Sequence, residues 1–203
     1  MAYLESIMIG ISIAAIPGPI FFELVRRTLT RGFWHGALLA VGEFLGNFAL
    51  LSLIFFGVSQ FLATMVSMII LYFVGAVILV FLGYSAFRFK AEGKDRPKIA
   101  IDDSILAGFL VAITSPIVLA LWISLSGSYL SRYESKSLAF FNVFLISSGF
   151  LVFFLPLAAV VHKIKRNILG KYVTFLSKLF GTVLIFYGAY FFLKLIRLLS
   201  SSL

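Results

Sequence analysis

The sequence predicts an all-α integral membrane protein with six transmembrane helices, built as two inverted three-helix repeats whose first and fourth helices are broken at prolines. Its 203 residues are 62% hydrophobic and 12% charged, and the mean hydropathy is +1.10. Such a composition lies far outside that of soluble globular domains. Six apolar runs reach the about 20 residues that a spanning helix needs. Prolines interrupt the first and the fourth run.

The composition excludes several classes of protein. Cysteine is absent, which rules out disulfides, thiolate metal sites and thiol redox relays. His35 and His162 lie at the ends of apolar runs, so we expect no metal site, no cofactor and no histidine-based catalysis. The net charge of +9 comes from residues between the runs, which predicts lipid headgroup contacts rather than nucleic acid binding. No cleavage motif follows the first run, so we expect that run to be retained.

The six predicted spans cover roughly residues 3–25, 36–61, 65–87, 105–129, 138–161 and 172–193. We expect one transmembrane domain over residues 1–203, with a first repeat at about 3–90, a charged linker at about 91–103 and a second repeat at about 104–199. The segment Ser6-Ile7-Met8-Ile9-Gly10 resembles Ser104-Ile105-Leu106-Ala107-Gly108, and a proline break follows both. Apolar helices also resemble each other by chance, but the recurring break favours an inverted repeat.

Lysine and arginine are distributed unevenly among the connections. The first, third and fifth connections carry thirteen: Arg26, Arg27, Arg31, Arg88, Lys90, Lys94, Arg96, Lys98, Lys163, Lys165, Arg166, Lys171 and Lys178. The remaining connections and the C-terminal end carry four: Arg132, Lys136, Lys194 and Arg197. Because basic residues mark cytoplasmic loops, this bias predicts that both termini lie outside.

The first break is Ile16-Pro17-Gly18-Pro19. Each proline lacks an N–H, so the carbonyls of Ile13 and Ala15 lose their helical partners. After Pro19 a new half-helix opens with unbonded N–H groups around Ile20, Phe21 and Phe22. Carbonyl ends favour cations and N–H ends favour anions, so both together suit a zwitterion.

The second break is Thr114-Ser115-Pro116, at the corresponding place in the fourth run. Ser115 is placed to cap a half-helix that begins at Pro116, and Ala112 loses its bonding partner. The alternative is a simple kink whose backbone groups are satisfied by Thr114 and by neighbouring helices.

Glu23 and Glu43 are the carboxylates that lie well inside apolar runs. Glu23 lies about 9 Å of helix rise beyond Pro17, and Glu43 about 10 Å into the second run. Intramembrane acids commonly mark a proton or substrate path. For Glu23 the alternative is a salt bridge with Arg26 or Arg27, three and four residues further on.

Glu43 has no basic residue nearby in sequence and is the better candidate for a group that binds and releases a proton. Packing against Asn47 or Thr114 is the alternative. We therefore expect the substrate or ion pathway to include Pro17, Gly18, Pro19, Glu23, Glu43, Asn47, Thr114, Ser115 and Pro116.

Further small and aromatic residues predict packing. Gly42 and Gly46 form a small-xxx-small pair typical of close helix contacts. Ser148, Gly149 and Pro156 interrupt the apolar sequence of the fifth run, and close helix packing is expected there as well. Trp34 and Tyr129 lie near run ends and are predicted to belong to an aromatic belt.

These motifs together resemble the LysE/RhtB family of amino-acid exporters. In the first half the resemblance rests on Pro17-Gly18-Pro19, Arg31-Gly32, Gly36 and Gly42-Glu43. In the second half it rests on Gly108-Phe109-Leu110 before Ser115-Pro116 and on Gly181-Thr182-Val183-Leu184-Ile185 before Gly188. Almost the whole chain is covered.

The resemblance implies six helices, export of small amino acids or related metabolites, and coupling to the proton gradient. Carried over by position, Pro17, Gly18, Pro19 and Glu43 match the family's motif. Thr114-Ser115-Pro116 departs from it, since the family has Asn-Pro, often followed by Lys, and here Ile117 follows. The resemblance also implies a homodimer as a candidate partner. Sister groups that use cysteine pairs or histidine-rich segments do not fit this chain.

The sequence thus favours a non-enzymatic secondary exporter in the cell (inner) membrane, with a small-molecule substrate bound near the midplane between the two breaks. Protonation of Glu43 would bias alternating access, and coupling to sodium is left open. The sequence is also compatible with an exporter of another small solute or ion, a membrane enzyme acting on lipid-linked substrates, or a non-transporting assembly or receptor subunit. Two breaks that face one polar cavity would favour transport, whereas a break plugged by apolar side chains would favour a structural role.

Overall fold

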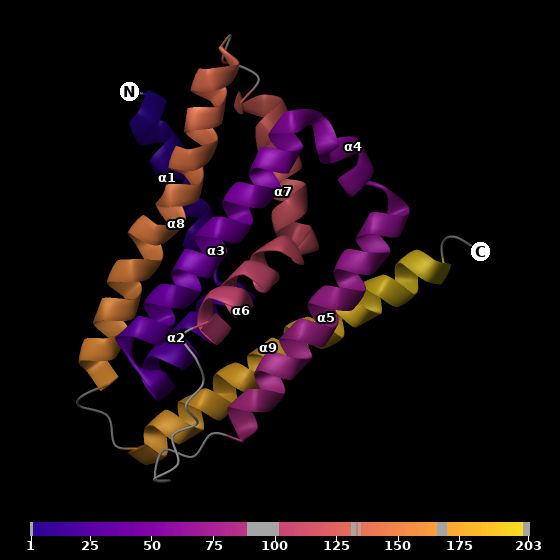
Figure 1. Ribbon diagram of the computed structural model, residues 1–203. Coiled ribbons are helices and arrows are strands. Elements are labelled where there is room, and N and C mark those ends of the chain that lie inside the picture. The colour runs from indigo at the N-terminus through magenta and orange to yellow at the C-terminus, as the bar shows by residue number, and fades with distance from the viewer. Residues whose placement is uncertain (1, 89–101, 131–132, 134, 166–169, 201–203) are drawn as a thin grey trace.

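The computed structural model describes residues 2–88, 102–130, 133, 135–165 and 170–200, and this part of the chain is helical with no strands (Figure 1). The elements are α1 (Ala2–Ala14), α2 (Pro19–Arg31), α3 (Phe33–Leu53), the π-helical η1 (Ile54–Val58), α4 (Ser59–Leu62), α5 (Met65–Phe87), α6 (Asp102–Ile113), α7 (Pro116–Ser128), α8 (Lys136–Lys165) and α9 (Gly170–Ser200). Residues 91–101 of the predicted linker lie outside the described residues, and its last two residues belong to α6.

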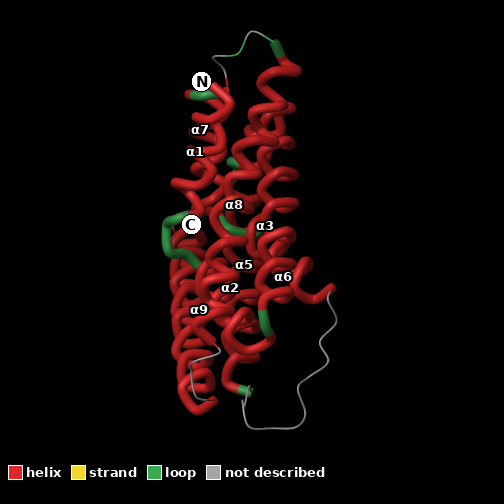
Figure 2. The backbone as a smooth tube through the Cα atoms, turned by 90° about the vertical axis from the view of Figure 1, so that its left-hand side faces the viewer, coloured by secondary structure: helices red, strands yellow, loops and turns green. Residues whose placement is uncertain are grey.

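Four helices, namely α3 with η1, α5, α8 and α9, are long and apolar enough to cross a membrane. Two bent pairs bring the number to six if each pair is one span: α1 with α2, bent by 77°, and α6 with α7, bent by 63°. The bends lie at the two proline breaks, so the predicted interruptions of the first and fourth runs are confirmed. In the view of Figure 2 the long helices run roughly in one direction, whereas Figure 1 shows that α9 is tilted relative to α8.

Helix α2 continues to Arg31, although the sequence predicted that the first run ends at Val25. Arg26 and Arg27, expected in a cytoplasmic connection, lie inside the helix and are buried. The helix can continue because both arginines pair with Glu23 one turn earlier on the same helix. The first connection shrinks to a turn at Gly32, whose φ of 105° suits glycine.

The second and fifth runs show how the structure treats helix continuity. The second run bends at Gly57, which has a left-handed φ of 93°, so that α3 passes through η1 into α4. Helix α8 runs through Pro156 without a break. Phe154 and Ala158, on either side of Pro156, are buried against other helices, and such packing holds a helix together around a proline.

Glycines set the closest helix contacts near the centre of the bundle. Gly42 of α3 and Gly108 of α6 lie at one contact, and Gly10 of α1 and Gly149 of α8 lie at another. A Cβ atom on any of these four glycines would collide with a backbone carbonyl of the facing helix. The predicted close packing at Gly42 is therefore confirmed. On the other side of the bundle, α5 and α9 pack along each other (Figure 1).

Candidate functional site

A cavity of about 190 Å³, here called the central cavity, lies between the two helix breaks. Pro17, Gly18 and Pro19 line it from the first break, and Thr114 and Ser115 line it from the second. Glu43 of α3 reaches the same space and is the one ionisable acidic or basic side chain among its described lining residues. The structure thus brings together six of the nine residues predicted from the sequence, and leaves Glu23, Asn47 and Pro116 outside the lining.

The chain at the first break is held by a tyrosine of α9. Helix α1 ends at Ala14, and the Tyr187 hydroxyl donates a hydrogen bond to the Pro17 carbonyl at 3.2 Å. The Ile13 carbonyl accepts from the Ile16 N–H at 3.2 Å, so the prediction that it lacks a partner was wrong. The turn tightens there, which is the usual way in which a helix end satisfies its carbonyls.

The second half of the break presents the N-terminus of α2 to the central cavity. Pro19 and Ile20 in its first turn both line the cavity, and Gly18 offers no side-chain cap. The Phe22 N–H donates to the Gly18 carbonyl at 3.3 Å, which corrects the prediction that this group is unbonded. The first turn of α2 is therefore an electropositive helix end that faces the cavity.

The second break has the predicted cap. The Ser115 hydroxyl accepts from the Val118 N–H at 3.5 Å, at the start of α7. The Thr114 hydroxyl donates to the Leu110 carbonyl at 2.6 Å. Both side chains thus satisfy nearby backbone groups, as a simple kink would require, while both residues also line the central cavity.

Glu43 and Asn47 form a buried polar strip on one face of α3. Glu43 is 4% exposed, and its Oε2 atom is buried with no hydrogen-bond partner among the described residues. One turn further on, Asn47 Oδ1 accepts from Trp122 Nε1 at 3.1 Å. Asn47 Nδ2 is buried and has no partner within the described part of the chain. The strip therefore carries unused hydrogen-bonding capacity beside the cavity.

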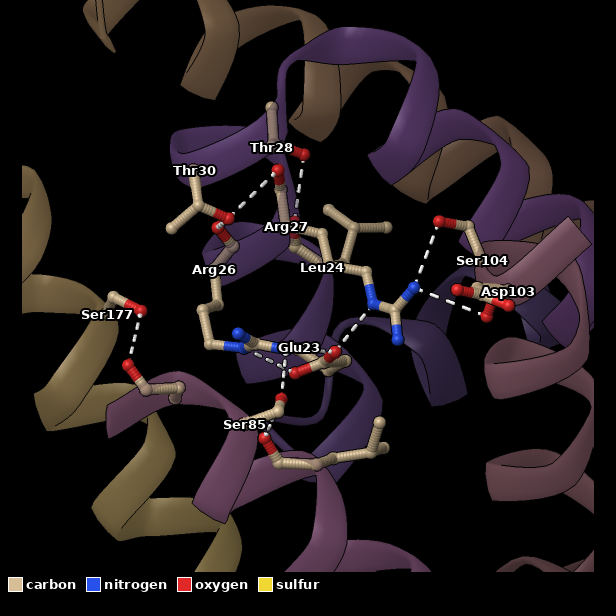
Figure 3. A network of polar contacts seen from close by, with 12 residues as sticks. Glu23, Leu24, Arg26, Arg27, Thr28, Thr30, Ser85, Asp103, Ser104 and Ser177 are labelled. Carbon is tan, nitrogen blue, oxygen red and sulfur yellow. Dashed lines mark hydrogen bonds and ion pairs between the residues drawn. The ribbon is translucent and has the colours of Figure 1, made fainter. Parts of the chain in front are cut away.

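Glu23 belongs to a separate ionic cluster, shown in Figure 3. Arg26 donates to both carboxylate oxygens of Glu23 at 2.6 and 2.7 Å, and Arg27 Nε donates to Oε1 at 2.5 Å. The cluster reaches Ser85 of α5 at 3.4 Å and Ser104 of α6 at 2.9 Å. The salt bridge named as the alternative for Glu23 is thus present, and it links α2 to two other helices.

A second polar cluster lies near the start of α1. The Ser6 hydroxyl donates to Asn142 Oδ1 at 2.5 Å and shares a hydrogen bond with the Tyr129 hydroxyl at 3.0 Å. The Tyr133 hydroxyl donates to that of Tyr129 at 2.9 Å, and burial, together with this bond, raises the pKa of Tyr133 to about 12. Tyr129 is buried, so its predicted place in an aromatic belt was wrong, whereas Trp34 is 72% exposed.

Most of the remaining cavity wall is apolar, with Phe150 and Phe154 of α8 and Leu79 of α5 among its residues. Sequence reasoning missed these side chains and also Tyr187. A tyrosine inside an apolar run needs a partner for its hydroxyl, and that need was the signal for Tyr187. Within the described residues, no group of three or more histidine, aspartate or glutamate side chains could hold a metal ion.

Comparison with known proteins identifies the family. The model of the LysE type translocator family matches residues 11–195. The chain belongs to this family. The resemblance drawn from the sequence motifs is therefore confirmed, and the chain is a multi-pass membrane translocator.

Two relatives cover most of this chain. It is 25% identical over 197 residues to "Putative amino acid efflux protein YcgF" of Bacillus subtilis, with 93% of this chain and 94% of the relative covered. It is 29% identical over 180 residues to "Chemotactic transduction protein ChpE" of Pseudomonas aeruginosa, with 81% and 84% covered. No solved structure matches this chain significantly.

Proposed function

We propose that this translocator is a secondary active exporter of amino acids or related small zwitterionic metabolites, with its substrate site in the central cavity. The observation that carries the proposal is the meeting of both helix breaks and Glu43 in one cavity. An electropositive end of α2 and a carboxylate offer opposite charges to one small ligand. The printed name of the Bacillus relative supports an amino-acid substrate.

We further propose that the chain is a single domain of six spans in two inverted repeats. The matched glycine contacts support this. Gly10 and Gly108 take the same place in the two similar segments, and they face the carbonyls of Ile146 in α8 and Leu39 in α3. Equivalent contacts of α1 with α8 and of α6 with α3 are what an inverted pair of repeats requires. Alternating access would then move one repeat against the other.

We place the protein in the inner membrane with both termini outside and the basic ends in the cytoplasm. Supporting this orientation, the C-terminal ends of α5 and α8, which basic residues follow or close in the sequence, lie toward the same end of the bundle (Figure 1). The α2 arginines contribute less than predicted, because they lie inside the bundle. The lipid bilayer and the substrate are the proposed partners, and a homodimer is the proposed assembly.

Coupling is assigned to Glu43, because it combines burial, an unpartnered oxygen and contact with the cavity. The test is gradient-driven flux of a panel of labelled amino acids in proteoliposomes, with proton and sodium gradients imposed separately. We expect flux with the proton gradient, and we expect Glu43→Gln to abolish it. Glu5→Gln, at an exposed acid of α1, is the matched control. Absence of gradient-dependent flux for every amino acid would refute the export proposal and favour an assembly or receptor role.

A further inference from the structure

The sides of the central cavity that α3 and α8 contribute differ in chemistry, although the two helices occupy matching places in the fold. Gly42 in α3 faces the carbonyl of Ile105, and Gly149 in α8 faces the carbonyl of Ile7. Ile7 and Ile105 hold the same place in the two similar segments near the starts of α1 and α6. The residue after each glycine lines the cavity, and it is Glu43 in α3 but Phe150 in α8.

We propose that the central cavity selects amino acids with apolar side chains, and that the substrate ammonium group and a proton compete for Glu43. This inference rests on the proposed function and specifies its substrate class and its exchange chemistry.

The apolar wall recognises the substrate side chain. Phe150 and, one turn further on, Phe154 are almost fully buried, and both line the cavity with Leu79 and Leu121. Trp122 packs behind Phe150 with ring centroids 5.8 Å apart, which fixes the wall from the outside. A charged side chain held against this wall would lose its hydration without gaining a partner. Lysine, arginine, aspartate and glutamate are therefore disfavoured, whereas leucine, methionine and phenylalanine fit.

The polar wall recognises the ammonium group. An ammonium has three N–H donors and no acceptor, so it matches a carboxylate with an unpartnered oxygen. Asn47, one turn from Glu43, is held by Trp122 and supports the same face of α3. The substrate carboxylate belongs at the other charged feature of the cavity, the first turn of α2 at Pro19 and Ile20.

The size of the cavity favours a ligand as small as a free amino acid. Its volume of about 190 Å³ lies below the roughly 300–1,000 Å³ of pockets that hold drug-sized ligands. A peptide whose N-terminal ammonium bound Glu43 would also place a neutral amide, instead of a carboxylate, at the first turn of α2.

Competition between the substrate ammonium and a proton for Glu43 gives an exchange step in which protons and charge balance. When the substrate ammonium binds, the Glu43 carboxylic acid releases its proton to water and becomes a carboxylate. The substrate keeps its three ammonium protons, and no bond other than that O–H breaks. Since Glu43 is the one acidic group among the described lining residues, it holds either the proton or the substrate cation. Transport in one direction therefore carries a proton in the other.

The first test is binding to the purified full-length protein. A ligand that binds the folded state raises the thermal midpoint by mass action. We expect leucine, methionine and phenylalanine to raise it, and lysine and glutamate at the same concentration to leave it unchanged. Leucine binding should release protons into weakly buffered solution, and Glu43→Gln should abolish the release.

The second test changes the apolar wall. We expect Phe150→Ala to weaken the Kd for leucine about tenfold, which corresponds to about 1.4 kcal/mol, and Phe150→Leu to weaken it less. Phe144→Ala is the matched control, since Phe144 lies two turns back along α8, is partly exposed and is outside the cavity lining. If Phe150→Ala does not elute as a folded species, the Kd values of Phe150→Leu for leucine and for phenylalanine are measured instead and decide the test.

The outcomes separate this inference from the proposed function. Lysine or glutamate binding as tightly as leucine would overturn the substrate class, and leucine binding without proton release would overturn the competition. In both cases gradient-driven amino-acid flux could persist. Absence of all gradient-driven amino-acid flux would instead refute the proposed function itself.

Discussion

Glu23 and Arg26 form a two-point ion pair within α2, in which Arg26 Nη2 and Nε donate to Glu23 Oε1 and Oε2 at 2.6 and 2.7 Å. Both side chains are buried, so each charge depends on the other for compensation. The pair lets α2 carry arginines through the bundle, and Arg26 ties the half-helix after the first break to Ser85 of α5. Arg27, which also donates to Glu23, ties it to Ser104 of α6.

Removing the carboxylate from this cluster should destabilise the protein strongly. Glu23→Ala leaves the Arg26 and Arg27 charges buried without compensation, and breaking such a pair costs about 3–5 kcal/mol. The measurement is thermal or denaturant unfolding of the purified protein in detergent. Glu5→Gln, at an exposed acid, should leave the midpoint unchanged. An unchanged midpoint for Glu23→Ala would show that the cluster does not hold α2.

A methyl group at the α3–α6 contact should also destabilise the fold. The Cβ of Gly42→Ala would collide with the Ile105 carbonyl, which belongs to backbone and cannot rotate away. Overpacking of this kind costs about 1–3 kcal/mol. The matched control is Gly127→Ala in α7, where the new Cβ meets nothing within 4 Å. The control should be neutral or slightly stabilising, because alanine favours helix over glycine. Equal unfolding midpoints for Gly42→Ala and Gly127→Ala would contradict the close contact between α3 and α6.

Sequence reasoning predicted the helix breaks well because their cause is local. A proline removes a backbone donor whatever surrounds it, so Pro17, Pro19 and Pro116 marked the positions where helices end or begin. The cap at Ser115 follows from the same local chemistry. Pro156, by contrast, lies inside α8, because buried neighbours stabilise the helix around it.

The candidate site was predicted only in part, because its other half depends on tertiary neighbours. Glu43 stood out as an acid in an apolar run, and the structure places it at the cavity. Phe150 looked like any other phenylalanine until the fold set it at the same cavity as Glu43. Glu23 was ambiguous, since spacing to Arg26 predicted a salt bridge as readily as a transport role. The end of α2 at Arg31 was misplaced, because pairing with Glu23 lets Arg26 and Arg27 be buried within the helix.

The hydrogen bond between Trp122 and Asn47 should be important for the stability of the cavity wall. Trp122→Phe keeps most of the ring but leaves Asn47 Oδ1 buried without its donor, which costs about 1–3 kcal/mol. Asn47→Leu removes the orphaned group, so the double variant should be less destabilised than the sum of the single variants. Unfolding midpoints of the three variants measure the coupling. Strict additivity would show that the bond contributes nothing.

Tyr133 should make stability depend on pH in the alkaline range. The pKa of its phenol is about 12, because burial disfavours the phenolate and because the phenol donates to the Tyr129 hydroxyl. Between about pH 10 and pH 12 the unfolded chain has already lost this proton while the folded chain retains it. The unfolded state then binds fewer protons, so the contribution of Tyr133 to stability is complete below about pH 10 and is lost as pH rises toward 12.

We therefore expect the unfolding midpoint of the wild type to fall relative to that of Tyr133→Phe between about pH 10 and pH 12. Tyr3→Phe, at an exposed tyrosine, is the control and should track the wild type. A constant difference between wild type and Tyr133→Phe from about pH 8 to about pH 12 would mean that the fold does not protect this phenol.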